Sequence, residues 1–304
     1  MGQELQNTDS IKEAIVQAVA FFDQFDYPLT SWELWRAIKI KTSLAEVLAV
    51  LEIGIDNLEQ QKGFYFLPGR EKTVVARLQR HNYALVKIKK AQRICKIFRW
   101  LPWIKLAAVA NMIGANNLKQ GSDIDLFVVT ENKKLWLTRF FTAGLSAILH
   151  QRPNIKNSQD KICLSFFVTE GGNDLRQFML QDERGNIQDD YFVYWLVGLA
   201  PVYQKEGYEY QDFLTVNAFI KDILPQFNAN LLPEHLTLRG LANNYYYELV
   251  DLFWGWLEPQ AKKLQLRLFP QQIKELMNKD SRVVVDDEVL KLHVNDRRKQ
   301  YNKM

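Results

Sequence analysis

The chain has 304 residues, of which 47% are hydrophobic and 24% are charged, and its formal net charge is +4. These values are typical of a globular chain with two or three domains, and so mild a positive charge permits anionic substrates without predicting a nucleic-acid binder. The spacing of the two cysteines, Cys95 and Cys163, predicts neither a disulfide framework nor a zinc site. The first ten residues lack a signal-peptide core and no apolar run is long enough to span a bilayer, so we expect a cytoplasmic protein without membrane partners.

Residues 1–70 are expected to form three helices and a hairpin. Apolar residues share one helical face between Ile11 and Phe25, and Thr30 or Ser31 caps a second helix that runs to about residue 38. A capping box at 43–46 opens a third helix that runs to about residue 60, and a hairpin follows at 62–69. This arrangement resembles a winged-helix domain.

The third of these helices is acidic, which argues against DNA binding. It carries no Lys or Arg between Lys41 and Lys62, although it carries several carboxylates. Because DNA phosphates attract cations, we expect no DNA binding by this helix. A candidate protein partner, or a role as an internal scaffold, is the favoured interpretation of the winged-helix-like region.

A long basic helix is predicted from Glu71 to Trp103. Its basic residues are Lys72, Arg77, Arg80, Lys87, Lys89, Lys90, Arg93, Lys96 and Arg99. A solvated connector helix is the favoured interpretation, and the alternative is the wall of a groove for a phosphate-rich substrate.

The motif with the clearest chemical meaning is Gly121-Ser122-Asp123-Ile124-Asp125-Leu126, followed by apolar residues to Val129. Gly121 and Ser122 predict a turn, and the apolar residues predict a buried strand. Alternation along a strand places Asp123 and Asp125 on one face, roughly 6–7 Å apart. Two such carboxylates repel each other, and a divalent cation such as Mg²⁺, or Mn²⁺, relieves the repulsion. The alternative is that both carboxylates cap the turn and face water.

This motif resembles the metal-binding strand of the polymerase-β-like nucleotidyltransferase superfamily, over roughly residues 106–170. The resemblance implies a strand, strand, helix, strand core at 104–188, in which Asp123 and Asp125 hold catalytic metal ions. It implies transfer of a nucleoside monophosphate from a nucleoside triphosphate (NTP) to an acceptor that the sequence does not identify. The residues expected beside the nucleotide are Asn111, Gly114, Asn116 and Ser122.

The sequence departs from the family pattern at two places. The upstream Gly-Ser pair falls on residues 111–112 or, with a shorter loop, on 114–115, and neither placement supplies the serine. The strand expected at 162–168 has Ser165 at its centre where a third carboxylate should lie, and Asp160 and Glu170 are the candidates near its ends. A catalytically degenerate protein that binds nucleotide or another protein therefore remains the alternative function.

The rest of the chain, 189–304, is expected to be a helical region. Helices are predicted at 191–202, 208–224 and 241–268, where the many aromatic residues favour a packed core over a base-stacking surface. In the segment 286–296, acidic residues with His293 and Asp296 are candidate ligands for a metal or an acceptor, although a structural role for His293 is favoured. The predicted fold is mixed α/β, with a small nucleotidyltransferase-type sheet, and the predicted divisions are 1–70, 71–103, 104–188 and 189–304.

Overall fold

The computed structural model describes residues 2–110, 113–114, 117–154, 157–228, 237–240 and 244–302. Its N-terminal region contains α1 (Gly2–Asp23), α2 (Ser31–Ala37) and α3 (Leu44–Ile53). These helices accompany a small antiparallel sheet in the order β1-β3-β2, formed by β1 (Leu29–Thr30), β2 (Glu59–Gln61) and β3 (Phe64–Phe66). The capping interactions expected from the sequence are present, because Thr30 caps α2 and Ser43 caps α3, each in a capping box.

Within the described residues, the centre of the molecule is a mixed sheet of seven strands in the order β8-β7-β4-β5-β6-β10-β9. Only the pairs β5–β6 and β7–β8 are parallel among these strands. The strands are β4 (Ile104–Val109), β5 (Ile124–Thr130), β6 (Ile162–Thr169), β7 (Ala200–Gln204), β8 (Leu238–Arg239), β9 (Val283–Val285) and β10 (Val289–Leu292). The mixed α/β class is therefore confirmed.

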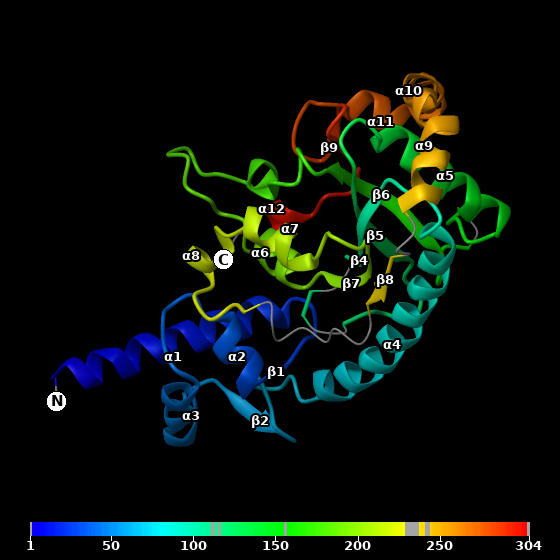
Figure 1. Cartoon of the computed structure of the whole chain (residues 1–304). Coiled ribbons are helices and arrows are strands. Elements are labelled where there is room, and N and C mark those ends of the chain that lie inside the picture. The colour runs from blue at the N-terminus through cyan, green and yellow to red at the C-terminus, as the bar shows by residue number, and fades with distance from the viewer. Residues whose placement is uncertain are drawn as a thin grey trace.

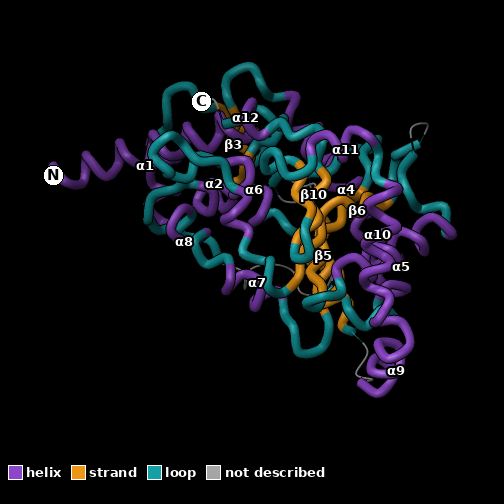
Figure 2. The backbone as a smooth tube through the Cα atoms, turned by 90° about the horizontal axis from the view of Figure 1, so that it is seen from above, coloured by secondary structure: helices purple, strands orange, loops and turns teal. Residues whose placement is uncertain are grey.

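Helices cover both faces of this sheet (Figure 2). One face packs against α4 (Lys72–Phe98), α5 (Leu135–Ile148) and α10 (Glu258–Leu268). The other face shares a continuous core with the N-terminal helices and with α6 (Asp190–Val197) and α7 (Tyr210–Val216). The remaining helical segments are η1 (Leu175–Phe178), α8 (Ile220–Ile223), α9 (Asn244–Trp254), η4 (Gly255–Leu257), α11 (Gln271–Leu276) and α12 (Arg298–Tyr301).

The alternation predicted for residues 124–129 is present in β5. Ile124, Leu126 and Val128 enter the core beneath α4 and α5, whereas Phe127 and Val129 enter the opposite core. A strand that is buried on both faces is apolar along most of its length, as these residues are. Asp125 interrupts this pattern on the face of Phe127, at the end of the strand where β5 begins.

Two helical predictions in the first half are too long. The third helix ends at Ile53 instead of near residue 60, because Gly54 follows with a φ of 91° and ends the helical conformation. The basic helix ends at Phe98, and Figure 1 shows it running along the side of the molecule from the N-terminal region towards α9.

We expected the region after residue 188 to be helical, but it contains strands as well as helices. The apolar stretch 191–202 divides at Gly198, after which β7 pairs with β4, and the stretch 208–224 divides into two helices near Asn217. The apolar residues at 283–292 form the hairpin β9–β10, which pairs with β6. These strands satisfy their backbone hydrogen bonds across the sheet, a tertiary effect that the local pattern does not contain. Among the described helices, none is long and apolar enough to cross a membrane.

Candidate functional site

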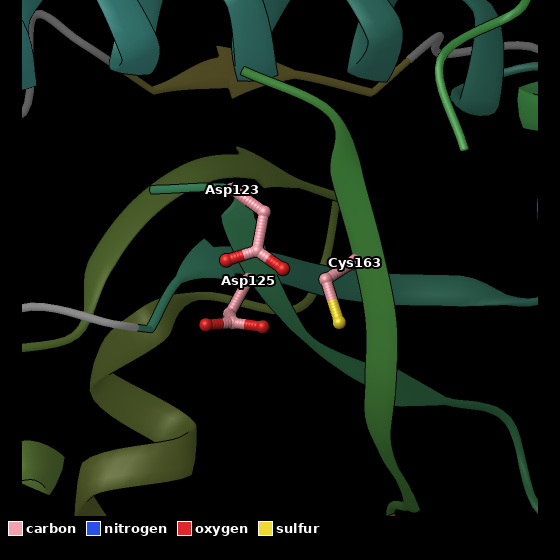
Figure 3. Close-up of side chains that lie close together, drawn as sticks. All are labelled: Asp123, Asp125 and Cys163. Carbon is pink, nitrogen blue, oxygen red and sulfur yellow. The ribbon is translucent and has the colours of Figure 1, made fainter. Parts of the chain in front are cut away.

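Three side chains from two neighbouring strands converge at one end of the sheet. Asp123 directly precedes β5, Asp125 is the second residue of β5, and Cys163 is the second residue of β6. Because β5 and β6 are parallel with Asp125 paired to Cys163, the thiol and the carboxylates meet (Figure 3). One carboxylate oxygen from each aspartate and the Cys163 Sγ all lie within 4.8 Å of one another. We call these three residues the Asp-Asp-Cys cluster.

The two carboxylates proposed from the sequence as third ligands lie elsewhere. Asp160 precedes β6 and accepts a hydrogen bond from Lys87 Nζ at 2.6 Å. Glu170 follows the far end of β6, where its carboxylate lies 3.6 Å from Lys105 Nζ. Neither is part of a potential metal-binding group among the described residues, and Cys163 occupies the position opposite Asp125 instead.

Burial and mutual repulsion disfavour negative charge on the three side chains of the cluster. Burial, followed by the charge of Asp123, raises the pKa of Asp125 to about 7, although the Cys163 thiol donates a hydrogen bond that acts in the opposite direction. Burial also raises the pKa of Asp123, and the charge of Lys87 partly offsets that effect. Burial, followed by the charge of Asp125, raises the pKa of the Cys163 thiol. Negative charge on this cluster is therefore costly.

Lys87, from the long basic helix, holds the turn that leads into β5. Its side chain is only 2% exposed, and its ammonium group donates to Ser122 O at 2.5 Å, Gln120 O at 3.1 Å and the Asp160 carboxylate. The Ser122 hydroxyl donates to Lys119 O at 3.0 Å, so Ser122 also stabilises this turn. These bonds fix the backbone immediately before Asp123.

The described part of the expected phosphate loop packs against the N-terminal region. Gly114 has a φ of 84°, and a Cβ atom at this position would lie 2.4 Å from the ring of Tyr27. Asn117 accepts a hydrogen bond from Arg80 at 3.3 Å and donates to Ile113 O at 2.9 Å. Asn111 and Asn116, which we expected beside the nucleotide, lie outside the described residues.

Several basic residues of α4 have structural partners and do not project freely into a groove. Arg77 donates to Glu33 at 2.6 Å and stacks on Tyr27, with its guanidinium carbon 3.7 Å from the ring centre. Arg80 pairs with Asp26 at 2.9 Å. Together with Lys87, these residues favour the connector interpretation for this part of the helix, whereas Lys72, Lys89, Arg93 and Lys96 are exposed.

The acidic residues near the C-terminal hairpin have local structural roles. Asp286 accepts hydrogen bonds from the backbone of residues 288 and 289, and Asp287 pairs with Lys262 at 2.6 Å. Asp296 pairs with Arg298 at 2.8 Å. No potential metal-binding group among the described residues includes them.

His293 lines a cavity on the same sheet face as Asp125. This cavity has a volume of about 170 Å³, and Phe166, Trp195 and Tyr191 also line it. The His293 ring lies 5.9 Å from that of Phe166, and burial, followed by the charge of Lys291, lowers the His293 pKa to about 4. Burial, followed by the charges of Tyr301, Asp296 and Asp125, raises the Tyr191 pKa to about 12.

Comparison of the chain with protein-family models, with curated proteins and with solved structures returns no match.

Proposed function

We propose that this chain is a nucleotidyltransferase that moves a nucleoside monophosphate from an NTP to an acceptor hydroxyl. The observation that carries the proposal is the convergence of Asp123 and Asp125 at the start of β5, with ligand atoms within 4.8 Å of each other and of Cys163. The neighbouring loop supports it, because Ala110 N donates to Asp125 O at 2.9 Å and Gly114 follows shortly after. The backbone that leads into the expected phosphate loop therefore lies beside Asp125.

In the proposed reaction, the acceptor oxygen attacks the α-phosphorus of the NTP. A new phosphorus–oxygen bond forms, the bond from the α-phosphorus to the bridging oxygen breaks, and pyrophosphate leaves with that electron pair. The hydroxyl proton passes to solvent. Catalysis of this class depends mainly on positioning and on stabilising phosphate charge. Asp123 and Asp125 would hold the cation that neutralises this charge, and Lys87 and Ser122 would hold the turn that positions Asp123.

The donor atoms fit the expected metal only in part. Mg²⁺ and Mn²⁺ prefer carboxylate and other oxygen ligands, which Asp123 and Asp125 supply. The third corner of the cluster is the sulfur of Cys163, which is a poor ligand for Mg²⁺.

The alternative is a catalytically degenerate protein that binds a nucleotide or another protein. Among the described residues, no third carboxylate joins Asp123 and Asp125 in the cluster, and this favours the alternative. The N-terminal helices and the β1-β3-β2 sheet support a winged-helix-like region, and Trp32, Leu48 and Ile53 are exposed there for a candidate protein partner.

Calorimetric titration tests the proposal. ATP, GTP, CTP and UTP are titrated into the full chain with Mg²⁺, with Mn²⁺ and with a chelator. We expect at least one nucleotide to bind only when a divalent cation is present, and we expect the D123N/D125N variant to lose this binding.

A matched double variant controls for the change of charge. D9N/D222N removes two exposed carboxylates outside the site and should bind nucleotide as the unmodified chain does. Nucleotide binding that ignores both the cation and D123N/D125N would favour the degenerate alternative. No binding of any nucleotide would refute the enzymatic proposal and direct attention to a protein partner.

A further inference from the structure

The Asp-Asp-Cys cluster combines hard and soft donor atoms at one point. We propose that it is a site for a thiophilic divalent cation of the Zn²⁺ class, and that it selects such a cation over Mg²⁺. This choice of cation does not rest on the proposed function. The spacing of the cysteines in the sequence did not predict a zinc site, because the three ligands meet only when β5 and β6 pair.

The need for a cation follows from the charges around Asp125. Asp125 lies beside a second carboxylate in a largely apolar part of the sheet, where negative charge is poorly solvated. Among the described residues, no Lys, Arg or His forms an ion pair with Asp125, whereas an oxygen of Asp123 lies within 4.8 Å of one of its oxygens. The buried ammonium group of Lys87, which lies behind the turn before β5, is already bonded to two carbonyl oxygens and to Asp160.

The sulfur of Cys163 determines which cation fits best. Mg²⁺ requires near-octahedral coordination by oxygen and usually retains several water molecules. Thiolate ligands select Zn²⁺ and other soft or borderline metals, and Zn²⁺ commonly combines Cys, His and carboxylate ligands. A cluster of two carboxylates and one thiolate therefore favours Zn²⁺.

The geometry also suits zinc coordination. Zn²⁺ bonds to oxygen at about 2.0–2.2 Å and to sulfur at about 2.3 Å, so its ligand atoms lie roughly 3.5 Å apart. The ligand atoms of Asp123, Asp125 and Cys163 are within 4.8 Å of one another, a separation that side-chain rotation can reduce. Three protein ligands with one open position are the pattern of zinc sites that accept a further ligand.

Cobalt spectroscopy tests the proposal without any nucleotide. Co²⁺ replaces Zn²⁺ in mixed thiolate sites, and a thiolate bound to Co²⁺ gives a charge-transfer band in the near ultraviolet. We expect the full chain, stripped of metal and kept reduced, to show this band at one Co²⁺ per chain. An equimolar addition of Zn²⁺ should abolish the band, whereas a large excess of Mg²⁺ should leave it unchanged.

The second cysteine provides the matched control. Cys95 is completely buried in α4 and is not part of the cluster, so C95A should retain the band. C163S should lose the band. It should also bind Zn²⁺ at least about 10–100-fold more weakly, because removing even a residue that only hydrogen-bonds to a metal ligand has an effect of this size. C163D should also lose the band, while becoming more responsive to Mg²⁺ because all three ligands are then carboxylates.

A measurement on the unmodified chain tests the proposal without depending on the folding of any variant. Zn²⁺ should protect Cys163 from alkylation, as mapped by mass spectrometry, and Mg²⁺ should not. Absence of the cobalt band, a band that persists in folded C163S, or equal protection by Mg²⁺ would each overturn the proposal. If the band appears but no nucleotide binds, the metal assignment stands and the transferase proposal fails. If nucleotide binds with Mg²⁺ and no cobalt band appears, the transferase proposal stands and the metal assignment fails.

Discussion

The position of the Asp125 carboxyl group has a cost to stability. Its neighbours on β5 are apolar and buried, and Asp123 lies beside it with the same charge. Burial and this like charge raise the Asp125 pKa to about 7, so its ionised form opposes folding when no cation is bound. Substitutions that remove such an unfavourable buried charge often stabilise a protein.

The first prediction concerns this cost. D125N should stabilise the metal-free protein at pH 8 by on the order of 2 kcal/mol, because a neutral amide of similar shape replaces an ionised carboxylate with a raised pKa. Urea unfolding in the presence of a chelator measures the change. D9N, which alters an exposed carboxylate, should change stability by less than about 0.5 kcal/mol. A destabilised D125N would show that the carboxylate is already compensated in the metal-free protein.

At the scale of elements, α4 stabilises the turn before β5 through Lys87. The ammonium group of Lys87 bonds to three oxygens at this turn, and the residue is 2% exposed. When a buried charged group is removed and its partners remain, those partners lose their hydrogen bonds and ion pairs. The basic helix therefore contributes to the site by fixing its backbone.

The second prediction follows from that contact. K87M should lower the free energy of unfolding by about 3–5 kcal/mol, because Asp160 and two carbonyl groups lose a charged donor. K89M alters an exposed lysine on the same helix and should have an effect below about 0.5 kcal/mol. Urea unfolding of the two variants compares them directly, and equal effects would show that Lys87 stabilises the turn no more than a surface lysine does.

Elements with a strong local signal were predictable from the sequence. The strand predicted at 162–168 matches β6 to within one residue, and the capping residues Thr30 and Ser43 begin α2 and α3 as expected. β5 was recognised because its large apolar residues follow a turn that contains Gly121. In these segments the local preference agrees with the tertiary structure.

The remaining features depend on contacts between distant segments. β7 was predicted as part of a helix, because the apolar stretch after residue 191 has no periodicity that separates its helical and strand parts. Cys163 was not predicted as a site residue, since its place beside Asp125 depends on the parallel register of β5 and β6. Strand alternation placed the two aspartates on one face, but it could not supply that register.

At the scale of the whole molecule, a buried polar cluster joins the C-terminal hairpin to α6. Arg298 donates to Asp189 at 2.7 Å and pairs with Asp296, and Lys291 lies 3.5 Å from Asp296. His293 lies among these charged residues, with Lys291 and Arg298 disfavouring its protonated form and Asp296 favouring it. The acid stability of the protein should therefore depend on His293.

The third prediction gives the sign of this dependence. An unfolded histidine binds a proton below about pH 6.5, whereas His293 in the folded protein binds one only below about pH 4. The unfolded state thus binds more protons between these values, and stability falls as the pH is lowered through this window, by up to about 3 kcal/mol. Urea unfolding across the window should show a shallower loss for H293Q than for the unmodified chain.

A second histidine variant controls for the other groups that titrate in this range. H150Q alters an exposed histidine and should keep the full loss of stability on acidification. If H293Q and the unmodified chain respond identically to acid, the protonation of His293 does not oppose folding.

The order of the strands has a consequence for synthesis of the chain on the ribosome. β6 pairs with β5 on one side and with β10 on the other, but β10 is translated long after β6. Until then, β6 has an unpaired edge of apolar residues, which is a template for aggregation. Nascent chains that stall between these strands should therefore bind chaperones and resist native folding, whereas chains that include the hairpin can close the sheet.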